Sequence, residues 1–127
     1  MTTKDIGDIG EKAAAKLLKK NGYKIIARNI HLSHNEIDIV AEDKEFIVFV
    51  EVKTRTFNPD GNSNYGLPSS AVNARKQDHL IRAAFDYLRL NPTDKQPRMD
   101  VMEVWLDQSH KVIKTNHIRN AYGVKKH

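Results

Sequence analysis

The chain has 127 residues, of which 39% are hydrophobic and 29% are charged; it carries a formal net charge of +5 and no cysteine. This length and balance fit a single folded domain, residues 1–127, and exclude a disordered chain. Without cysteine, disulfides and thiolate metal sites are excluded as well. The chain has no apolar run long enough to span a bilayer, and its first residues, MTTKDIGDIGEK, lack the apolar core of a signal peptide, so we expect a cytoplasmic protein with no membrane partner. The positive charge favours a polyanionic partner, most simply nucleic acid contacted through its phosphates.

The first predicted element is a helix from Asp5 to Asn21, which Gly22 ends. Its apolar residues recur at helical spacing and form one face, comprising Ile6, Ile9, Ala13 and Leu17 with Gly10, Ala14 and Leu18 beside them. Glu11 falls near the rim of this face. The pattern by itself favours a solvated glutamate on the edge of the helix.

Three strands are predicted next, at residues 23–29, 36–42 and 46–53. The third is apolar on both faces, which predicts a central strand covered by a helix on each side. Glu51 and Lys53 stand at its end and share one face, while Val52 points to the other. Burying such an acid and base costs several kcal/mol per ion unless they are paired or hold a ligand.

Residues 54–68 are rich in Asn, Gly, Pro and Ser and predict a long, exposed, flexible loop. A second helix is predicted from Ser69 or Ser70 to Leu90. Lys76 lies on its apolar side near the N-terminal end, either as a snorkelling lysine or as a ligand contact. Two further strands, residues 99–106 and 111–117, and a basic tail, residues 121–127, complete the prediction.

The acidic and basic residues of the second and third strands form a candidate site. If these strands are neighbours, as their short connection suggests, Asp38, Glu51 and Lys53 gather at one edge of the sheet. A divalent cation relieves the repulsion between two carboxylates, and Mg²⁺ takes one or two protein carboxylates with other oxygens, here the backbone carbonyl of Val52. Lys53 would orient or deprotonate an attacking water, and Glu11 would complete the site. An ion pair at the end of a strand explains the same residues about equally well.

The order helix, three strands, helix, strand, with Glu, then Asp, then Glu-x-Lys, resembles the PD-(D/E)xK nuclease superfamily. More closely, the stretches GDIGEKAAAKLLKKNGYKIIARNI, NEIDIV, FVEVKTR, YGLPSSAV and RMDV resemble the YraN-like family of predicted endonucleases, relatives of archaeal Holliday junction resolvases. The resemblance implies a three-layer α/β restriction-endonuclease-like fold, with a central mixed sheet flanked by helices. It also implies catalytic positions at Glu11, Asp38, Glu51 and Lys53, magnesium or manganese as cofactor, and a homodimer that acts on branched DNA.

The predicted function is a metal-dependent endonuclease that hydrolyses DNA at branched or distorted structures in recombination or repair. Candidate DNA contacts are Arg55, Lys76 and Tyr65, which either stacks on an unpaired base or is simply exposed. The alternative is a non-catalytic nucleic-acid-binding module that retains the fold, and a third hypothesis is a scaffold in a DNA-processing complex. Stabilisation by a divalent cation distinguishes the first hypothesis, because a ligand that binds only the folded state must stabilise it.

Overall fold

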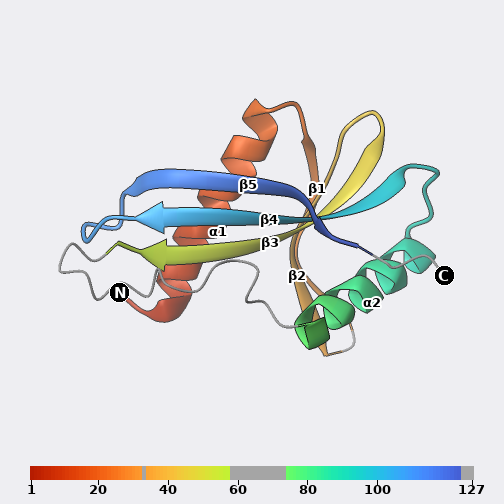
Figure 1. The fold of residues 1–127 in the computed structure, drawn as a ribbon, viewed down its shortest axis with the longest axis horizontal. Helices are drawn as coiled ribbons and strands as arrows, with labels where there is room; N and C mark the ends of the chain where they lie inside the picture. The colour runs from red at the N-terminus through yellow and green to blue at the C-terminus, as the bar shows by residue number, and fades with distance from the viewer. Residues whose placement is uncertain (33, 58–73, 124–127) are drawn as a thin grey trace.

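The computed structural model describes residues 1–32, 34–57 and 74–123, and it has a five-stranded sheet between two helices (Figure 1). The elements are α1 (Thr3–Lys20), β1 (Lys24–Leu32), β2 (Asn35–Glu42), β3 (Phe46–Thr56), α2 (Ala74–Leu90), β4 (Gln96–Leu106) and β5 (Val112–Tyr122). The strands lie in the order β1-β2-β3-β4-β5, and every pair is antiparallel except the parallel pair β3–β4. The predicted three-layer α/β fold with a central mixed sheet is therefore confirmed. In the part of the chain described, neither helix has the length and apolar character needed to cross a membrane.

Local signals at both ends of α1 explain its bounds. At the start, the Thr2 hydroxyl accepts a hydrogen bond from the Asp5 N–H at 3.1 Å, and the Asp5 carboxylate accepts one from the Thr2 N–H at 3.0 Å, which together form a capping box. At the end, Gly22 has a φ of +94° and the Tyr23 N–H donates to the Leu18 carbonyl at 3.0 Å. This Schellman motif confirms Gly22 as the residue that ends the helix.

Two hydrophobic cores cover the two faces of the sheet, one under each helix. Val50 points into the core under α1, where it lies with Leu18. Its neighbour Phe49 points into the core under α2, where its ring meets that of Tyr87 edge to face with centroids 5.7 Å apart. Because consecutive residues of β3 are buried on opposite faces, the predicted central position of this strand is confirmed.

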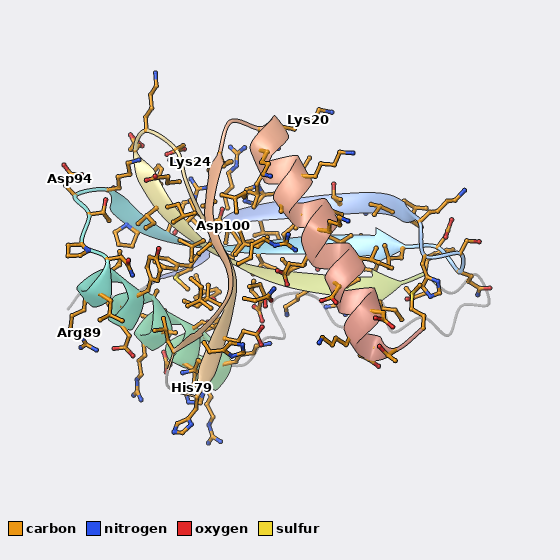
Figure 2. All side chains as sticks on the ribbon, turned by 180° about the vertical axis from the view of Figure 1, so that it is seen from behind. Lys20, Lys24, His79, Arg89, Asp94 and Asp100 are labelled. Carbon is orange, nitrogen blue, oxygen red and sulfur yellow. The ribbon has the colours of Figure 1, made fainter. Side chains whose placement is uncertain are left out.

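A buried polar cluster joins β4 to the edge strand β5. Asp100, labelled in Figure 2, is 0% exposed. It accepts hydrogen bonds from Arg98 at 2.9 and 2.8 Å and from the Asn120 N–H at 2.9 Å. Its Oδ2 also lies 2.7 Å from Nε2 of His117. Burial alone would raise the pKa of Asp100, but the hydrogen bonds from His117, Arg98 and Asn120 hold it below its ordinary value. This cluster fixes the position of β5 against β4.

Several predicted element boundaries differ from the observed ones. The predicted loop at 54–68 begins too early, because Thr54–Thr56 belong to β3 and pair with Val104–Leu106 of β4. The predicted tail, 121–127, likewise begins too early, since β5 runs through Tyr122. Pairing with a neighbouring strand extends these elements beyond the predicted bounds, and the Thr and Tyr residues that they contain are themselves common in strands. Residues 58–68, Ser69 and Ser70, and residues 124–127 lie outside the described residues.

Candidate functional site

The site lies where the β1–β2 hairpin leaves β3. The pairing of β2 with β3 ends at Ile39 and Val50, whereas β2 stays paired with β1 as far as Asn35. Figure 1 shows the two strands of the hairpin turning steeply away from β3, β4 and β5. Beyond the last backbone pair, the Val52 N–H donates to Oδ2 of Asp38 at 2.8 Å. The carboxylate of Asp38 therefore takes the place of a backbone partner and spans the gap between the diverging strands.

The surroundings of Asp38 disfavour the charged form of its carboxylate. Its pKa is raised from 3.8 to about 6, chiefly by burial and against the lowering effect of the Val52 hydrogen bond. The nearby carboxylates Glu11, Glu36 and Glu51 raise it further. A cation placed beside Asp38 would stabilise its charged form and offset the repulsion from these carboxylates.

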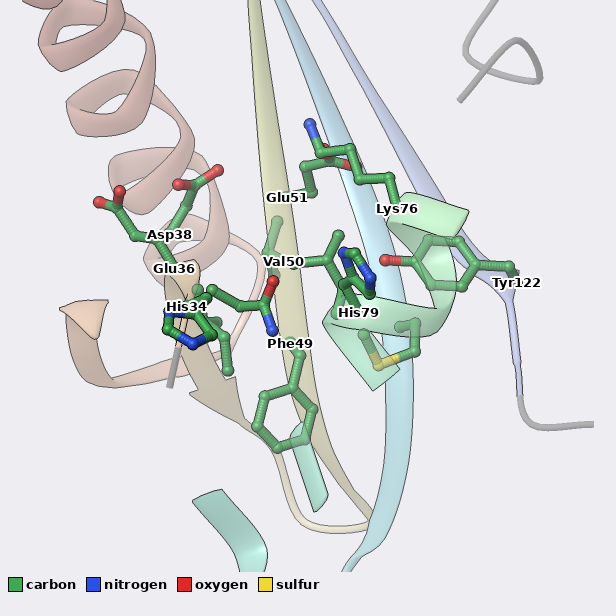
Figure 3. Close-up of a pocket in the computed structure, with 13 residues that line it drawn as sticks. His34, Glu36, Asp38, Phe49, Val50, Glu51, Lys76, His79 and Tyr122 are labelled. Atoms are coloured by element: carbon green, nitrogen blue, oxygen red, sulfur yellow. The ribbon is translucent and has the colours of Figure 1, made fainter. Parts of the chain in front are cut away.

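Glu51 is a buried carboxylate, 7% exposed, whose two oxygens have different surroundings. Its Oε2 lies 2.6 Å from the Lys76 ammonium, in a charge–charge contact that lacks the alignment of a hydrogen bond. Its Oε1 is buried and has no hydrogen-bond partner among the described residues. Figure 3 shows the Lys76 side chain reaching from α2 over Glu51. Because Glu51 faces α2 while Val52 packs into the core under α1, the predicted alternation of this strand is confirmed.

Glu11 is buried at 6% exposure, so the solvated glutamate favoured by the helical pattern is wrong. Nε of Arg28 in β1 donates to its Oε1 at 3.1 Å. Gly10 explains the burial, since a Cβ at this position would lie 1.8 Å from Oγ1 of Thr54. The absence of a side chain lets α1 approach β3 closely and carries the next residue, Glu11, against the sheet. Sequence reasoning missed Arg28, although a glycine on an apolar helix face was a signal for this close approach.

Lys53 is half-buried on the same face as Glu51 and pairs through its backbone with Glu103 of β4. Burial lowers the pKa of Lys53, the charge of Glu51 raises it, and the charges of Lys76 and Arg55 lower it again, with a net shift below the ordinary value. The Arg55 guanidinium lies over the Trp105 ring, 5.8 Å from its centroid. The candidate DNA contact Tyr65 lies outside the described residues.

Two cavities meet at Asp38. One, of about 280 Å³, lies on the α2 side, and its lining includes Glu51, Lys76, His34, His79 and Tyr122. The other, of about 650 Å³, lies on the α1 side, and its lining includes Lys4, Glu11, His31, Val52 and Thr54. Asp38 and Glu36 line both cavities. In Figure 3 their carboxylates point toward α1, away from the pair of Glu51 and Lys76.

The donor set of the described residues fits a hard cation held mainly by oxygens and water. No three His, Cys, Asp or Glu side chains in the described ranges are grouped so as to hold a metal ion between them. Two acids would nevertheless gain from a nearby cation. The pKa of Asp38 is raised, and Oε1 of Glu51 has no hydrogen-bond partner among the described residues. Two carboxylates, a backbone oxygen and waters are what Mg²⁺ typically takes, whereas a structural zinc site needs four protein ligands.

Comparison with known proteins places the chain in a family. The model of "Uncharacterised protein family UPF0102" matches residues 10–104. A UPF0102 protein of Caldanaerobacter subterraneus subsp. tengcongensis is 45% identical over 121 residues, which cover 94% of this chain and 95% of that one. Another, from Symbiobacterium thermophilum, is 47% identical over 100 residues, covering 78% and 80% of the two chains.

Among solved structures, an XisH family protein from Nostoc punctiforme covers 84% of this chain and 98% of its own, with a TM-score of 0.42 and 13% identity. A likeness this low carries no argument about function. The family model and the curated relatives agree with the resemblance noted in the sequence. The chain therefore belongs to the uncharacterised protein family UPF0102, the YraN family.

Proposed function

We propose that this protein is a metal-dependent endonuclease that hydrolyses phosphodiester bonds in DNA, at branched or distorted structures, in cytoplasmic recombination or repair. One observation carries the proposal. The half-buried Asp38 and the buried Glu51 both line the α2-side cavity where the β1–β2 hairpin leaves β3, and the half-buried Lys53 shares the face of Glu51. Charges in such a position cost several kcal/mol each unless a ligand compensates them, and a cation together with a phosphate would do so.

Asp38, Glu51 and the carbonyl of Val52 would hold Mg²⁺ or Mn²⁺, with the Asp38 carboxylate, which points toward α1 in Figure 3, turned toward Glu51. When bound, the cation would stabilise the negative charge that develops on the phosphate during hydrolysis. The Val52 N–H orients Asp38 through the 2.8 Å hydrogen bond, and Arg28 orients Glu11 through the 3.1 Å contact. These two contacts come from rigid strands, which favours fixed carboxylate positions.

Lys53 would act both on the proton of the attacking water and on the negative charge of the phosphate. Its lowered pKa increases the share of neutral amine, which can accept a proton from an attacking water. In its charged form the same group would stabilise the transferring phosphate. Arg55 and Lys76 would contact phosphates along the DNA, and Tyr65 would stack on an unpaired base.

A second function, binding nucleic acid without cleaving it, is favoured by two other observations. Glu51 is already paired with Lys76 at 2.6 Å, and no three-ligand metal group exists within the described parts of the chain. Such a module would bind DNA with a strong salt dependence but without any effect of divalent cations.

Cleavage assays distinguish the two functions. Labelled four-way junction, flap, single-stranded and linear duplex DNA would be incubated with Mg²⁺, Mn²⁺ or EDTA and with wild type, Asp38→Asn or Lys53→Ala. Lys44→Ala, in the turn before β3, serves as a control for the lost charge. We expect metal-dependent cleavage that both site variants lose and the control retains, while all four proteins still bind DNA. Cleavage that survives both site substitutions would indicate a contaminating nuclease, and binding without cleavage would support the second function.

The homodimer implied by the resemblance belongs to the same proposal. Light scattering of the purified protein, with and without junction DNA, measures its mass in solution. A monomer under both conditions would contradict this part of the proposal and leave the cleavage site untouched.

A further inference from the structure

Lys76 and Glu51 form an ion pair whose two members differ strongly in exposure. The Lys76 side chain is 59% exposed and the Glu51 side chain 7%. A second pair with the same 2.6 Å separation, Lys95 and Glu42, is more evenly exposed, at 28% and 24%. The Lys76 pair therefore joins a fixed, buried acid to a base whose long side chain extends largely through solvent.

This asymmetry decides which partner can leave. A buried carboxylate cannot move into water without rearranging β3, and it needs a counter-charge where it stands. A lysine on the surface of a helix has a flexible stem and a strongly hydrated ammonium, so moving Lys76 away from the pair costs less than moving Glu51. Oε1 of Glu51 has no hydrogen-bond partner among the residues described, which leaves room for a second positive group at the same carboxylate.

We propose that Lys76 is the resident counter-ion of Glu51 and that a divalent cation displaces it when the site is loaded. This inference rests on the proposed function, because it takes Glu51 as a metal ligand. Displacement would move the Lys76 ammonium away from Glu51 at the edge of the α2-side cavity, which Lys76 lines together with His79. There it would be available to a DNA phosphate, so that metal binding and phosphate binding support one another.

The test measures metal affinity in the absence of DNA. Isothermal titration calorimetry with Mn²⁺ would compare wild type, Lys76→Met, Lys76→Gln and Lys76→Arg. Lys95→Met is the matched control, since it removes the same charge from a pair with the same separation outside the two site cavities. Loss of a competing ion pair worth up to about 1 kcal/mol should tighten Mn²⁺ binding about fivefold in Lys76→Met and Lys76→Gln. Lys76→Arg and Lys95→Met should bind as wild type does.

Equal or weaker Mn²⁺ binding by both uncharged variants would overturn the inference, because a merely structural lysine gives no gain in affinity when removed. Asp38→Asn separates this failure from failure of the proposed function. If wild type binds Mn²⁺ and Asp38→Asn does not, but the Lys76 variants bind as wild type does, only the counter-ion role is wrong. If wild type and all variants bind no Mn²⁺, the metal site and the counter-ion role are both wrong.

Discussion

Replacing Asp38 with Asn should stabilise the protein at neutral and alkaline pH. The pKa of Asp38 is raised from 3.8 to about 6 in the folded state, so the folded protein binds this proton more tightly than the unfolded chain does. Its stability therefore falls as the pH rises from about 4 to about 6 and stays lower above that range. Asparagine cannot ionise, yet its side-chain oxygen can still accept the hydrogen bond from the Val52 N–H.

The magnitude follows from the size of the pKa change. One pKa unit corresponds to about 1.4 kcal/mol, so the rise from 3.8 to about 6 destabilises the wild type by at most about 3 kcal/mol at pH 8. For a domain of this size, that difference shifts the melting temperature by about 10 °C. Urea unfolding of wild type and Asp38→Asn at intervals from pH 4 to pH 8, in EDTA, measures it. A variant that is no more stable than wild type at pH 8, or equally more stable at every pH, would refute the reasoning.

The substitution Asp43→Asn serves as a control, because we expect it to change the stability of the folded protein in the opposite direction. The Asp43 carboxylate accepts backbone hydrogen bonds from Phe46 at 2.7 Å and from Glu45 at 2.9 Å. The hydrogen bond from Phe46 is the main cause that lowers the pKa of Asp43. Burial raises this pKa and the hydrogen bond from Glu45 lowers it again, so that the pKa stays below its ordinary value. Its ionised form stabilises the folded state above the unfolded pKa, and this contribution is lost as the pH falls through the folded pKa. The substitution should therefore destabilise the protein at pH 7, and the difference should shrink toward pH 3.

Three further predictions concern Glu51 of the site and two residues, Asp100 and Gly10, that hold the surrounding elements in place. Asp100→Ala should lower the free energy of unfolding in urea by about 3–5 kcal/mol, because it leaves the half-buried Arg98 without its carboxylate partner; a loss below 1 kcal/mol would contradict this role. Gly10→Ala should destabilise by about 1–3 kcal/mol through overlap with Thr54, and adding Thr54→Ala should recover part of the loss in the same assay. Mn²⁺ should raise the melting temperature of wild type but not of Glu51→Gln, and equal shifts in both would exclude Glu51 as a ligand.

The sequence predicts those features of the fold that depend on local pattern. The run from Phe46 to Val50 is apolar on both faces, and this is sufficient to place β3 in the centre of the sheet. Strand alternation places Glu51 and Lys53 on one face without any knowledge of their neighbours. The end of α1 at Gly22 is equally local, because it depends on one residue that tolerates a positive φ.

Features that depend on distant partners could not be predicted in this way. Thr54–Thr56 continue β3 because β4 supplies their hydrogen bonds, whereas the Asn, Gly, Pro and Ser residues that follow them in the sequence led to a loop prediction from Thr54 onward. The burial of Glu11 depends on Arg28, which lies 17 residues away in β1. The helical pattern places Lys76 on the inner side of α2, but only the packing of α2 against the sheet identifies Glu51 as its partner.

The central claim is that Asp38, Glu51 and Lys53 form a metal-dependent DNA-cleaving site, and one rate comparison tests it most directly. The initial rate of four-way junction cleavage in Mn²⁺ and in EDTA would be measured for wild type and Lys53→Ala at equal DNA occupancy. We expect cleavage by wild type in Mn²⁺ alone and a loss of at least about 100-fold in the variant, the size expected for removing a group that acts in proton transfer. Equal rates for the two proteins, or a wild-type rate unchanged by EDTA, would contradict it.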